Sequence, residues 1–161
     1  MNIFMPMTDI YESVKSLDDN RLRKQILEVW QLCELFKKEQ KGELFGRGYH
    51  NHPVYKYYSQ NINGYYFMQL YGMFACREYK YRFGKEHKLA YAFKSNAWGF
   101  CFHPAYIAGQ KAKGTQEIDT TDRAYSKYRT KLTEKWDNDK QPPKWTKRFP
   151  PPWYRVKESN E

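Results

Sequence analysis

Apolar residues recur at helical spacing over three stretches of the chain. The first follows Leu17-Asp18-Asp19-Asn20, whose polar side chains can cap a helix, and it comprises Leu22, Ile26, Val29, Trp30, Cys33 and Phe36. We therefore predict a helix from about Asp19 to Lys38, with Gly42 placed to follow its C-terminus. Glu28 falls six residues after Leu22, off the centre of the apolar stripe, and should face a cleft or solvent.

The second stretch predicts a long central helix. From about Asn61 to Arg82, a set of mostly apolar and aromatic residues recurs at three- and four-residue steps, and Gly84 follows as a stop; the residues are Phe67, Leu70, Tyr71, Phe74, Glu78 and Tyr81. The segment His50-Asn51-His52-Pro53 before it predicts a loop that enters this helical region. Proline suits a first helical turn, and it disfavours helix in the residue that precedes it.

The third stretch predicts the last helix. Asp119, Thr120 and Thr121 can cap it, and its apolar face comprises Ala124, Tyr125, Tyr128, Leu132 and Trp136, up to an end near Asp137. Between the central and the last helix, residues 85–118 lack sustained periodicity and contain Gly99, Pro104, Gly109 and Gly114. We predict a loop there, with room for one short helix around Ala105.

The tail from Lys140 onward predicts neither helix nor sheet. Prolines stand among large aromatic residues, which excludes helix and favours an extended strap; they are Pro142, Pro143, Pro150, Pro151 and Pro152, among Trp145, Phe149, Trp153 and Tyr154. The predicted fold class is therefore all-α. We expect a single compact domain over residues 1–161, with about three main helices, long loops and an extended, aromatic, Pro-rich C-terminal strap.

The composition indicates what kind of molecule the protein binds. The formal net charge is +10, and the basic residues are spread along most of the chain, with Arg21 and Lys157 near its two ends, so the folded surface should be electropositive. Aromatic residues make up 19% of the chain, and tyrosine is the most frequent of them. Tyrosine can bury its ring while its hydroxyl stays at the surface, and such rings suit stacking on bases. Nucleic acid is the favoured partner, although a merely soluble basic protein would carry the same charge.

The cysteines and the apolar runs exclude several other classes. Cys33, Cys76 and Cys101 are an odd, widely spaced set without a CxxC pair, which argues against a disulfide framework and against a cysteine zinc site. The N-terminal segment, residues 1–7, carries no basic residue, and no apolar run approaches the roughly 18 residues that span a bilayer. We expect a monomeric, cytoplasmic protein without a membrane segment, associated with the nucleoid or located in host cytoplasm if viral.

Familiar catalytic motifs are absent from the sequence. It contains no Gly-rich phosphate loop, no GxSxG elbow and no HExxH helix. His50 and His52 could supply two metal ligands, as could Cys101 and His103, but the spacing resembles no known closed site, so we expect neither a metal nor another cofactor. Two interpretations of His50 and His52 stay open: a hydrogen-bonded pair that orders the turn, or contacts to phosphate or base.

A short apolar N-terminus is followed by Leu17-Asp18 with Leu22 and Glu28, and then by Gly48-Tyr49-His50-Asn51-His52-Pro53. This order of short motifs resembles the pyrimidine dimer DNA glycosylase (bacteriophage endonuclease V-like) family. Arg82-Phe83-Gly84 is similar to the basic-Gly end of the family's central helix, and Pro151-Pro152-Trp153-Tyr154 is similar to its aromatic strap. The resemblance touches most of the chain outside residues 85–118, a segment longer than the smallest members lead us to expect.

This resemblance implies a base-excision DNA repair glycosylase with abasic-site lyase activity. The substrate would be double-stranded DNA with a pyrimidine dimer or another modified base. The resemblance places the catalytic carboxylate on Glu28 and the nucleophile on the N-terminal amine. Here that amine belongs to Met1, because Asn2 is too large for efficient removal of Met1, whereas the phage enzyme exposes a small residue. An α-amine also suits the chemistry by itself, since its reference pKa of about 7.7–8.0 leaves more neutral amine than a lysine near 10.4.

The predicted DNA contacts lie around the first helix, in the His50 loop and in the strap. Arg21 is the preferred phosphate contact, and Trp153 and Tyr154 should brace the opened site. The full set is Asn2, Arg21, Arg23, Lys24, Arg47, His50, Asn51, His52, Trp153 and Tyr154. Two other functions remain open. One is a catalytically inactive module that recognises distorted or modified DNA, which Asn2 after a retained Met1 would fit. The other is a protein-interaction factor that uses the tyrosines and the proline-rich tail.

Overall fold

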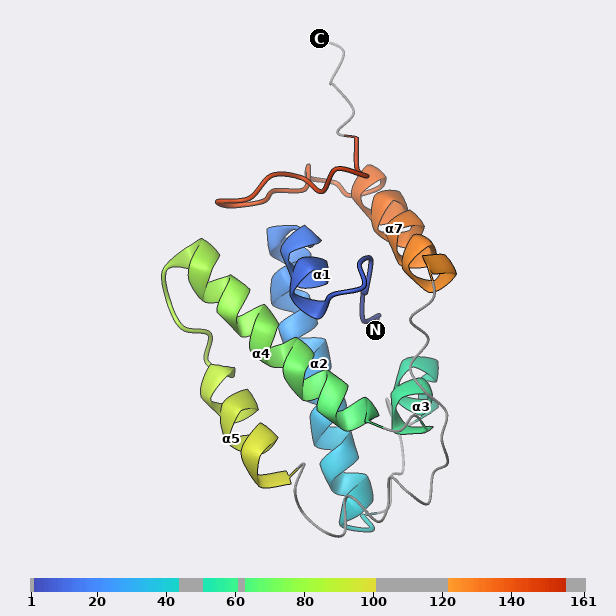
Figure 1. Ribbon diagram of the computed structural model, residues 1–161, viewed down its shortest axis with the longest axis vertical. Helices are drawn as coiled ribbons and strands as arrows, with labels where there is room; N and C mark the ends of the chain where they lie inside the picture. The colour runs from blue at the N-terminus through green and yellow to red at the C-terminus, as the bar shows by residue number, and fades with distance from the viewer. Residues whose placement is uncertain (1, 44–50, 61–62, 101–121, 156–161) are drawn as a thin grey trace.

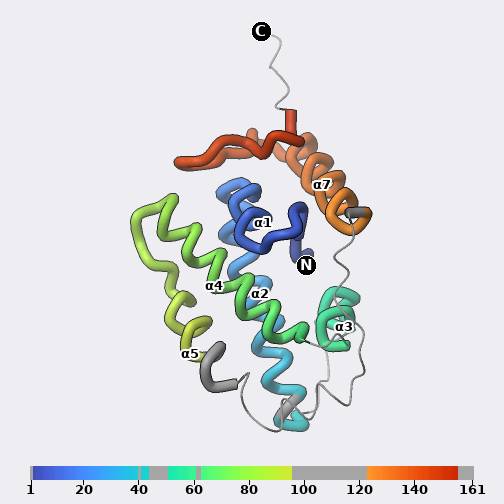
Figure 2. Tube along the Cα trace, in the orientation of Figure 1, coloured from blue at the N-terminus to red at the C-terminus, as the bar shows by residue number. Residues whose placement is uncertain are grey.

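The computed structural model describes residues 2–43, 51–60, 63–100 and 122–155, which form packed helices crossed by an extended C-terminal segment (Figures 1 and 2). In chain order the helices are α1 (Ile10–Ser16), α2 (Asp19–Gln40), α3 (Pro53–Gln60), α4 (Gly64–Phe83), α5 (Ala90–Phe100) and α7 (Asp122–Asp137). No strand occurs in these described ranges. The predicted all-α single domain is confirmed.

The two longest helices, α2 and α4, pack against each other at the centre of the molecule. The predicted apolar stripe of α2 is completely buried at Leu22, Ile26 and Val29. Both helices end at the predicted glycines: Gly42 and Gly84 have φ angles of +68° and +69°, a left-handed conformation that glycine adopts without steric cost. The predictions for these two helices are therefore confirmed to within a few residues.

The loop predicted for residues 85–118 is wrong over its first part, because α5 is a helix that packs on α4. Phe93 is fully buried and meets Trp30 edge-on at 5.3 Å between ring centroids. Gly72 of α4 allows this approach, since a Cβ atom at that position would lie 2.1 Å from the Phe93 ring. The packing of α5 on α4 thus depends on the space left by Gly72, and a repeating apolar pattern within α5 is not needed for it. The expected short helix around Ala105 lies outside the described residues.

Two further short helices add to the three that the apolar pattern predicts. α1 buries only Ser13, Val14 and Ser16, which is too few apolar positions to show periodicity. α3 begins at Pro53, as the loop-to-helix prediction requires, but it is separate from α4. The predicted last helix corresponds to α7 and ends at Asp137, and its proposed caps Asp119, Thr120 and Thr121 lie outside the described residues.

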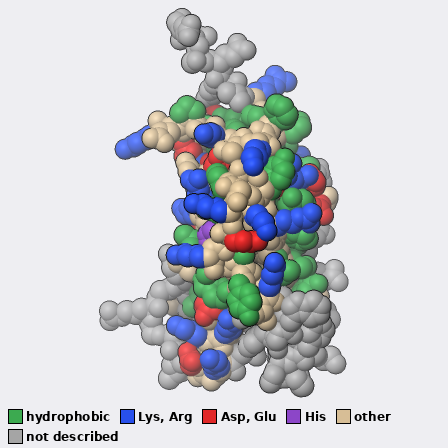
Figure 3. Space-filling view, turned by 90° about the vertical axis from the view of Figure 1, so that its left-hand side faces the viewer, with side chains coloured by type: hydrophobic (Ala, Val, Ile, Leu, Met, Phe, Trp, Pro, Cys, Tyr) green, Lys and Arg blue, Asp and Glu red, His purple; other side chains and the backbone are tan. Residues whose placement is uncertain are grey.

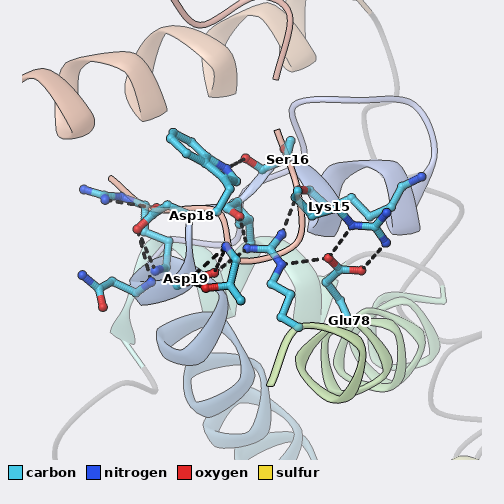
Figure 4. A network of polar contacts seen from close by, with 12 residues as sticks. Lys15, Ser16, Asp18, Asp19 and Glu78 are labelled. Atoms are coloured by element: carbon cyan, nitrogen blue, oxygen red, sulfur yellow. Dashed lines mark hydrogen bonds and ion pairs between the residues drawn. The ribbon is translucent and has the colours of Figure 1, made fainter. Parts of the chain in front are cut away.

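The strap, residues 140–155, crosses the end of the molecule where α1 meets α2 (Figure 1). Buried carboxylates tie this junction together (Figure 4). The Asp19 carboxylate accepts hydrogen bonds from the Thr146 hydroxyl at 2.6 Å and from the Arg82 guanidinium at 3.0 Å. Glu78 of α4 accepts hydrogen bonds from Arg82 at 2.8 Å and from Arg148 of the strap at 2.9 Å. The strap is therefore an integral part of the fold.

Candidate active site

The first residues of the chain lie against α2 and α4. Ile3, Phe4 and Met5 are all buried. The Phe4 amide donates to the Gln25 side-chain carbonyl at 3.0 Å, the Gln25 amide donates back to the Asn2 carbonyl, and the Tyr71 hydroxyl donates to the Phe4 carbonyl at 2.8 Å. These contacts fix the direction in which the chain approaches α2.

Glu28 lies beside this N-terminal segment. Its carboxylate accepts a hydrogen bond from the Gln25 side-chain amide at 2.9 Å and a longer one from the Asn2 backbone nitrogen at 3.4 Å. The Lys24 ammonium lies 3.8 Å away on the solvent side. Although Glu28 is only 9% exposed, it lines a cleft, which confirms the prediction that it faces away from the centre of the apolar stripe.

This Glu28 cleft has a volume of about 610 Å³. Its walls comprise Asn2 and Phe4, the α2 residues Asn20, Arg21, Lys24, Gln25 and Glu28, and, from α7 and the chain after it, Lys135, Asp139, Lys140 and Gln141. Four of these residues are cationic and two are anionic. The cleft therefore favours an anionic ligand while it holds one carboxylate next to the N-terminal segment.

Arg21 lies in the cleft, but its guanidinium is already paired. It donates to both carboxylate oxygens of Asp139, at 2.6 and 3.0 Å, and to Asp18 at 3.2 Å. Burial alone would lower the pKa of Arg21, but the hydrogen bonds to Asp139 and Asp18 outweigh it and raise the pKa above its ordinary value. A phosphate at Arg21 would thus have to compete with Asp139.

The other predicted contacts from the first half of the chain are not all gathered in the cleft. Asn2 and Lys24 line it, whereas the exposed Arg23 does not and instead lies over the Phe83 ring at 4.4 Å. Met1, Arg47 and His50 lie outside the described residues. Asn51 is exposed just before α3.

His52 has a structural role at the start of α3. Its Nδ1 atom accepts a hydrogen bond from the Val54 amide at 3.2 Å. This hydrogen bond fits the interpretation in which the histidine pair orders the turn, while His50, the other member of the pair, lies outside the described residues. A contact from His52 to DNA stays a prediction.

Trp153 and Tyr154 belong to an aromatic cluster with Trp136 and Trp145, which joins the strap to α7. Trp153 stacks on Trp136 at 5.4 Å with an angle of 22° between the rings, and Tyr154 packs against Trp136 at 4.6 Å. Tyr154 is buried and Trp153 is half-buried. Both rings pack within the protein, and bracing of opened DNA by either ring stays a prediction.

Sequence reasoning missed several residues of the site. The sequence could have revealed Gln25, because it is a polar residue inside the apolar stripe of α2. In the structure it is only 1% exposed. A buried amide of this kind requires hydrogen-bond partners. Tyr71 is predicted as part of the apolar stripe of the central helix, and the pattern does not indicate that its hydroxyl binds the Phe4 carbonyl. Lys135, Asp139, Lys140 and Gln141 gave no local signal, since only the folded chain brings them to α2.

Neither a metal-ligand cluster nor a membrane-spanning helix occurs among the described residues. They contain no group of three or more His, Cys, Asp or Glu side chains that could hold a metal ion. None of the helices found in them is long and apolar enough to cross a bilayer.

Comparison with known proteins points to one family. No curated protein and no solved structure matches the chain. The family model described as pyrimidine dimer DNA glycosylase matches residues 1–91, which include the N-terminal segment, α2 with Gln25 and Glu28, and α4 with Tyr71. The matched part thus contains the carboxylate and the residues that fix the N-terminal segment beside it. The chain belongs to the pyrimidine dimer DNA glycosylase family, whose substrate is DNA.

Proposed function

We propose that this protein is a bifunctional DNA glycosylase and abasic-site lyase. It excises pyrimidine dimers or another modified base from double-stranded DNA, with the Met1 amine as nucleophile and Glu28 as the catalytic carboxylate. The observation that carries the proposal is the 3.4 Å contact between the Asn2 nitrogen and the Glu28 carboxylate. Met1 is bonded to Asn2, and one residue of chain spans at most about 3.8 Å. The Met1 amine therefore lies within about that distance of the Asn2 nitrogen, which contacts Glu28.

The proposed reaction needs a neutral amine and a nearby carboxylate. The amine lone pair forms a bond to the sugar C1′, while the glycosidic bond breaks and its electrons leave with the base, which takes up a proton. The nitrogen then loses a proton, and the C1′–O4′ bond opens as O4′ is protonated, which leaves an iminium ion. Loss of a proton from C2′ expels the 3′ phosphate and cleaves the strand. Glu28 is placed to accept the proton of the amine, to return a proton to O4′ and to stabilise the cation.

The rest of the cleft supports substrate positioning. Lys24 is 70% exposed, and Lys135 and Lys140 are also exposed, so these ammonium groups are accessible to phosphates. Gln25 and Tyr71 act as positioning residues, because they hold the backbone of Asn2 and Phe4 rather than the substrate. A shift of about 1 Å in the amine can cost about 100-fold in rate.

Borohydride trapping on a duplex with an abasic site, and on one with a thymine dimer, tests the proposal. The reduced conjugate should carry the sugar remnant on the Met1 nitrogen, as shown by mass spectrometry of the N-terminal peptide. Selective acetylation of the α-amine should abolish trapping. Glu28→Gln should slow single-turnover base release by roughly 100- to 10,000-fold, the range for general acid–base groups, with duplex binding retained. Glu34→Gln is the matched control, because Glu34 lies on the same helix but pairs with Lys37 outside the cleft.

Each failure has a different meaning. A conjugate on Lys24 or another lysine after acetylation would refute the N-terminal nucleophile, although lyase chemistry would survive. Near-normal excision by the Glu28→Gln variant would remove Glu28 from the mechanism. Tight duplex binding without any trapping would favour the inactive DNA-binding module instead.

A further inference from the structure

A second cleft, here called the tyrosine cleft, lies on the other side of the N-terminal segment. Its volume is about 590 Å³, within the usual range for ligand sites. Five aromatic side chains from α3, α4 and α7 line it: Tyr57, Tyr58, Phe67, Tyr125 and Tyr128. Tyr57, Phe67 and Tyr128 are half-buried, so parts of these rings face the cleft. Such walls suit a flat, apolar group better than a phosphate.

Cations from a single helix form the rim of the tyrosine cleft. Arg123, Lys127 and Lys131 all line it and are all exposed. They are four residues apart, so they lie on one face of α7, with a rise of about 6 Å between neighbours. We call these three residues the α7 ridge. Among the described residues that line the tyrosine cleft there is no carboxylate, so nothing in its wall neutralises the ridge.

The ridge connects the tyrosine cleft with the Glu28 cleft. Between them lies a shallower hollow of about 490 Å³. It shares Lys131 with the tyrosine cleft and Asn2, Arg21 and Asp139 with the Glu28 cleft. Lys135, one helical turn after Lys131, lines both the hollow and the Glu28 cleft. Residues of α7 thus line all three hollows, and in Figure 1 this helix extends between the strap and α3.

We propose that the tyrosine cleft and the α7 ridge together bind single-stranded DNA, with unpaired bases on the tyrosine rings and phosphates on the ridge. A cationic groove beside aromatic rings is the combination that single-strand-binding proteins use. In an intact duplex the base faces are stacked and paired, so a duplex could use the ridge but not the rings. The inference rests on the proposed function only in taking DNA as the partner. All three ridge cations and two of the five aromatic residues come from α7, which lies beyond the residues that match the family model.

The first test measures binding of a short oligothymidylate by fluorescence anisotropy at several salt concentrations. The variant in which Arg123, Lys127 and Lys131 are all changed to Gln should lower the slope of log K against log salt by about 2, since each phosphate contact to a single strand contributes about 0.7. The matched control changes Lys41, Lys85 and Lys88 to Gln. These lysines are also exposed and line none of the three hollows, so the slope should stay close to that of the wild type.

The second test separates stacking from charge. Tyr57→Leu keeps apolar bulk but removes the flat ring, and it should weaken oligothymidylate binding at least about five-fold, the lower end of base–aromatic stacking. Affinity for an undamaged duplex should change by less than about two-fold. Tyr91→Leu is the control, because Tyr91 is an 81% exposed ring on α5. Thermal unfolding of each variant verifies folding, and the ridge variant keeps the proposal testable if Tyr57→Leu is unstable.

Two results would overturn the proposal: equal weakening of single strand and duplex by Tyr57→Leu, or an unchanged salt slope in the ridge variant. The binding experiment uses undamaged DNA and needs no catalysis. Loss of excision with intact oligothymidylate binding would therefore refute only the proposed function. Normal trapping on duplex DNA without oligothymidylate binding would refute only this inference.

Discussion

Arg21 and Asp139 hold each other across the Glu28 cleft. Their paired hydrogen bonds join the start of α2 to the residues that follow α7, and both side chains line the cleft. Without DNA, Asp139 therefore occupies the position in which Arg21 would meet a phosphate. If Arg21 contacts a phosphate of DNA, that phosphate competes with Asp139 for the guanidinium.

Asp139→Asn should consequently strengthen duplex binding. Removal of the carboxylate frees Arg21 and deletes one negative charge from the cleft, and we expect a gain of roughly two- to five-fold at low salt, the scale of a partly exposed ion pair. The salt slope should become steeper by about 0.9 if Arg21 gains one phosphate. Equilibrium binding to a labelled duplex measures both quantities. Asp137→Asn, an exposed residue of the same region that does not line the cleft, controls for the general effect of charge. An equal gain in both variants would contradict the competition.

For single residues, the sequence predicted that Glu28 faces a cleft or solvent, but it did not predict which residues surround the carboxylate. Glu28 stood out because its position relative to Leu22 puts it beside the apolar stripe. The partners of Arg21 could not be read in the same way, since Asp139 is 118 residues distant in the chain. Arg21 therefore looked like a free phosphate contact, and only the structure reveals its competitor. Lys and Arg side chains are also scattered over the face in Figure 3, so charge alone does not single out a contact.

Among the elements, the α1–α2 junction depends most on buried charge. Arg82 is 1% exposed, and besides Asp19 and Glu78 it donates to the backbone carbonyls of Lys15 and Leu17 (Figure 4). It thus connects α4 to the chain between α1 and α2. Burial opposes ionisation of Glu78, but hydrogen bonds from Arg148 and Arg82 outweigh it and lower the pKa of Glu78 below its ordinary value.

Glu78→Gln should reduce the free energy of unfolding at neutral pH by about 3 kcal/mol or more, because it leaves a buried guanidinium without one of its carboxylates. A carboxylate whose pKa is lower in the folded state contributes fully above its unfolded pKa, near 4.3, and loses that contribution as pH falls through the folded pKa. The difference between wild type and variant should therefore shrink below about pH 4. Urea unfolding at several pH values measures it. Glu86→Gln, which breaks the exposed pair with Lys80, should change stability little.

The helices that the sequence predicted are those that bury an apolar stripe. α2, α4 and α7 repeat apolar residues over several turns, so local spacing sufficed for them. α5 could not be predicted, since its position depends on Gly72 of another helix. The contacts that decide such elements are long-range, and a local pattern cannot contain them.

For the whole molecule, the strap is as much a part of the fold as α2. The Trp145 indole donates to the Ser16 carbonyl at 2.9 Å, the Thr146 hydroxyl donates to the Asp19 carboxylate, and Arg148 pairs with Glu78. A chain that ends at residue 140 loses all three contacts and exposes the Trp136 ring. Each buried group left unpaired costs about 1–3 kcal/mol, against a total stability of about 5–15 kcal/mol for an ordinary domain.

The chain that ends at residue 140 should therefore lose cooperative unfolding in a circular dichroism melt and fail to bind duplex DNA. A chain that ends at residue 155 is the length control, because it keeps the contacts of Trp145, Thr146 and Arg148, and it should melt like the wild type. Cooperative melting of the shorter chain at the wild-type temperature would show that the strap merely covers the helices.

Both the N-terminal segment and the end of α7 contact α2, so the fold can be completed only after α7 has been synthesised. The Asp18 side chain that caps α2 accepts a hydrogen bond from the Trp136 indole, 118 residues later in the chain. At a synthesis rate of about 5–20 residues per second, that partner is made roughly 6–24 s after Asp18 itself. The Glu28 cleft also needs Gln141, so during this interval the N-terminal segment and Glu28 are already present while one wall of the cleft is missing. A ribosome-bound chain therefore contains Glu28 and the N-terminal segment well before the cleft around them is complete.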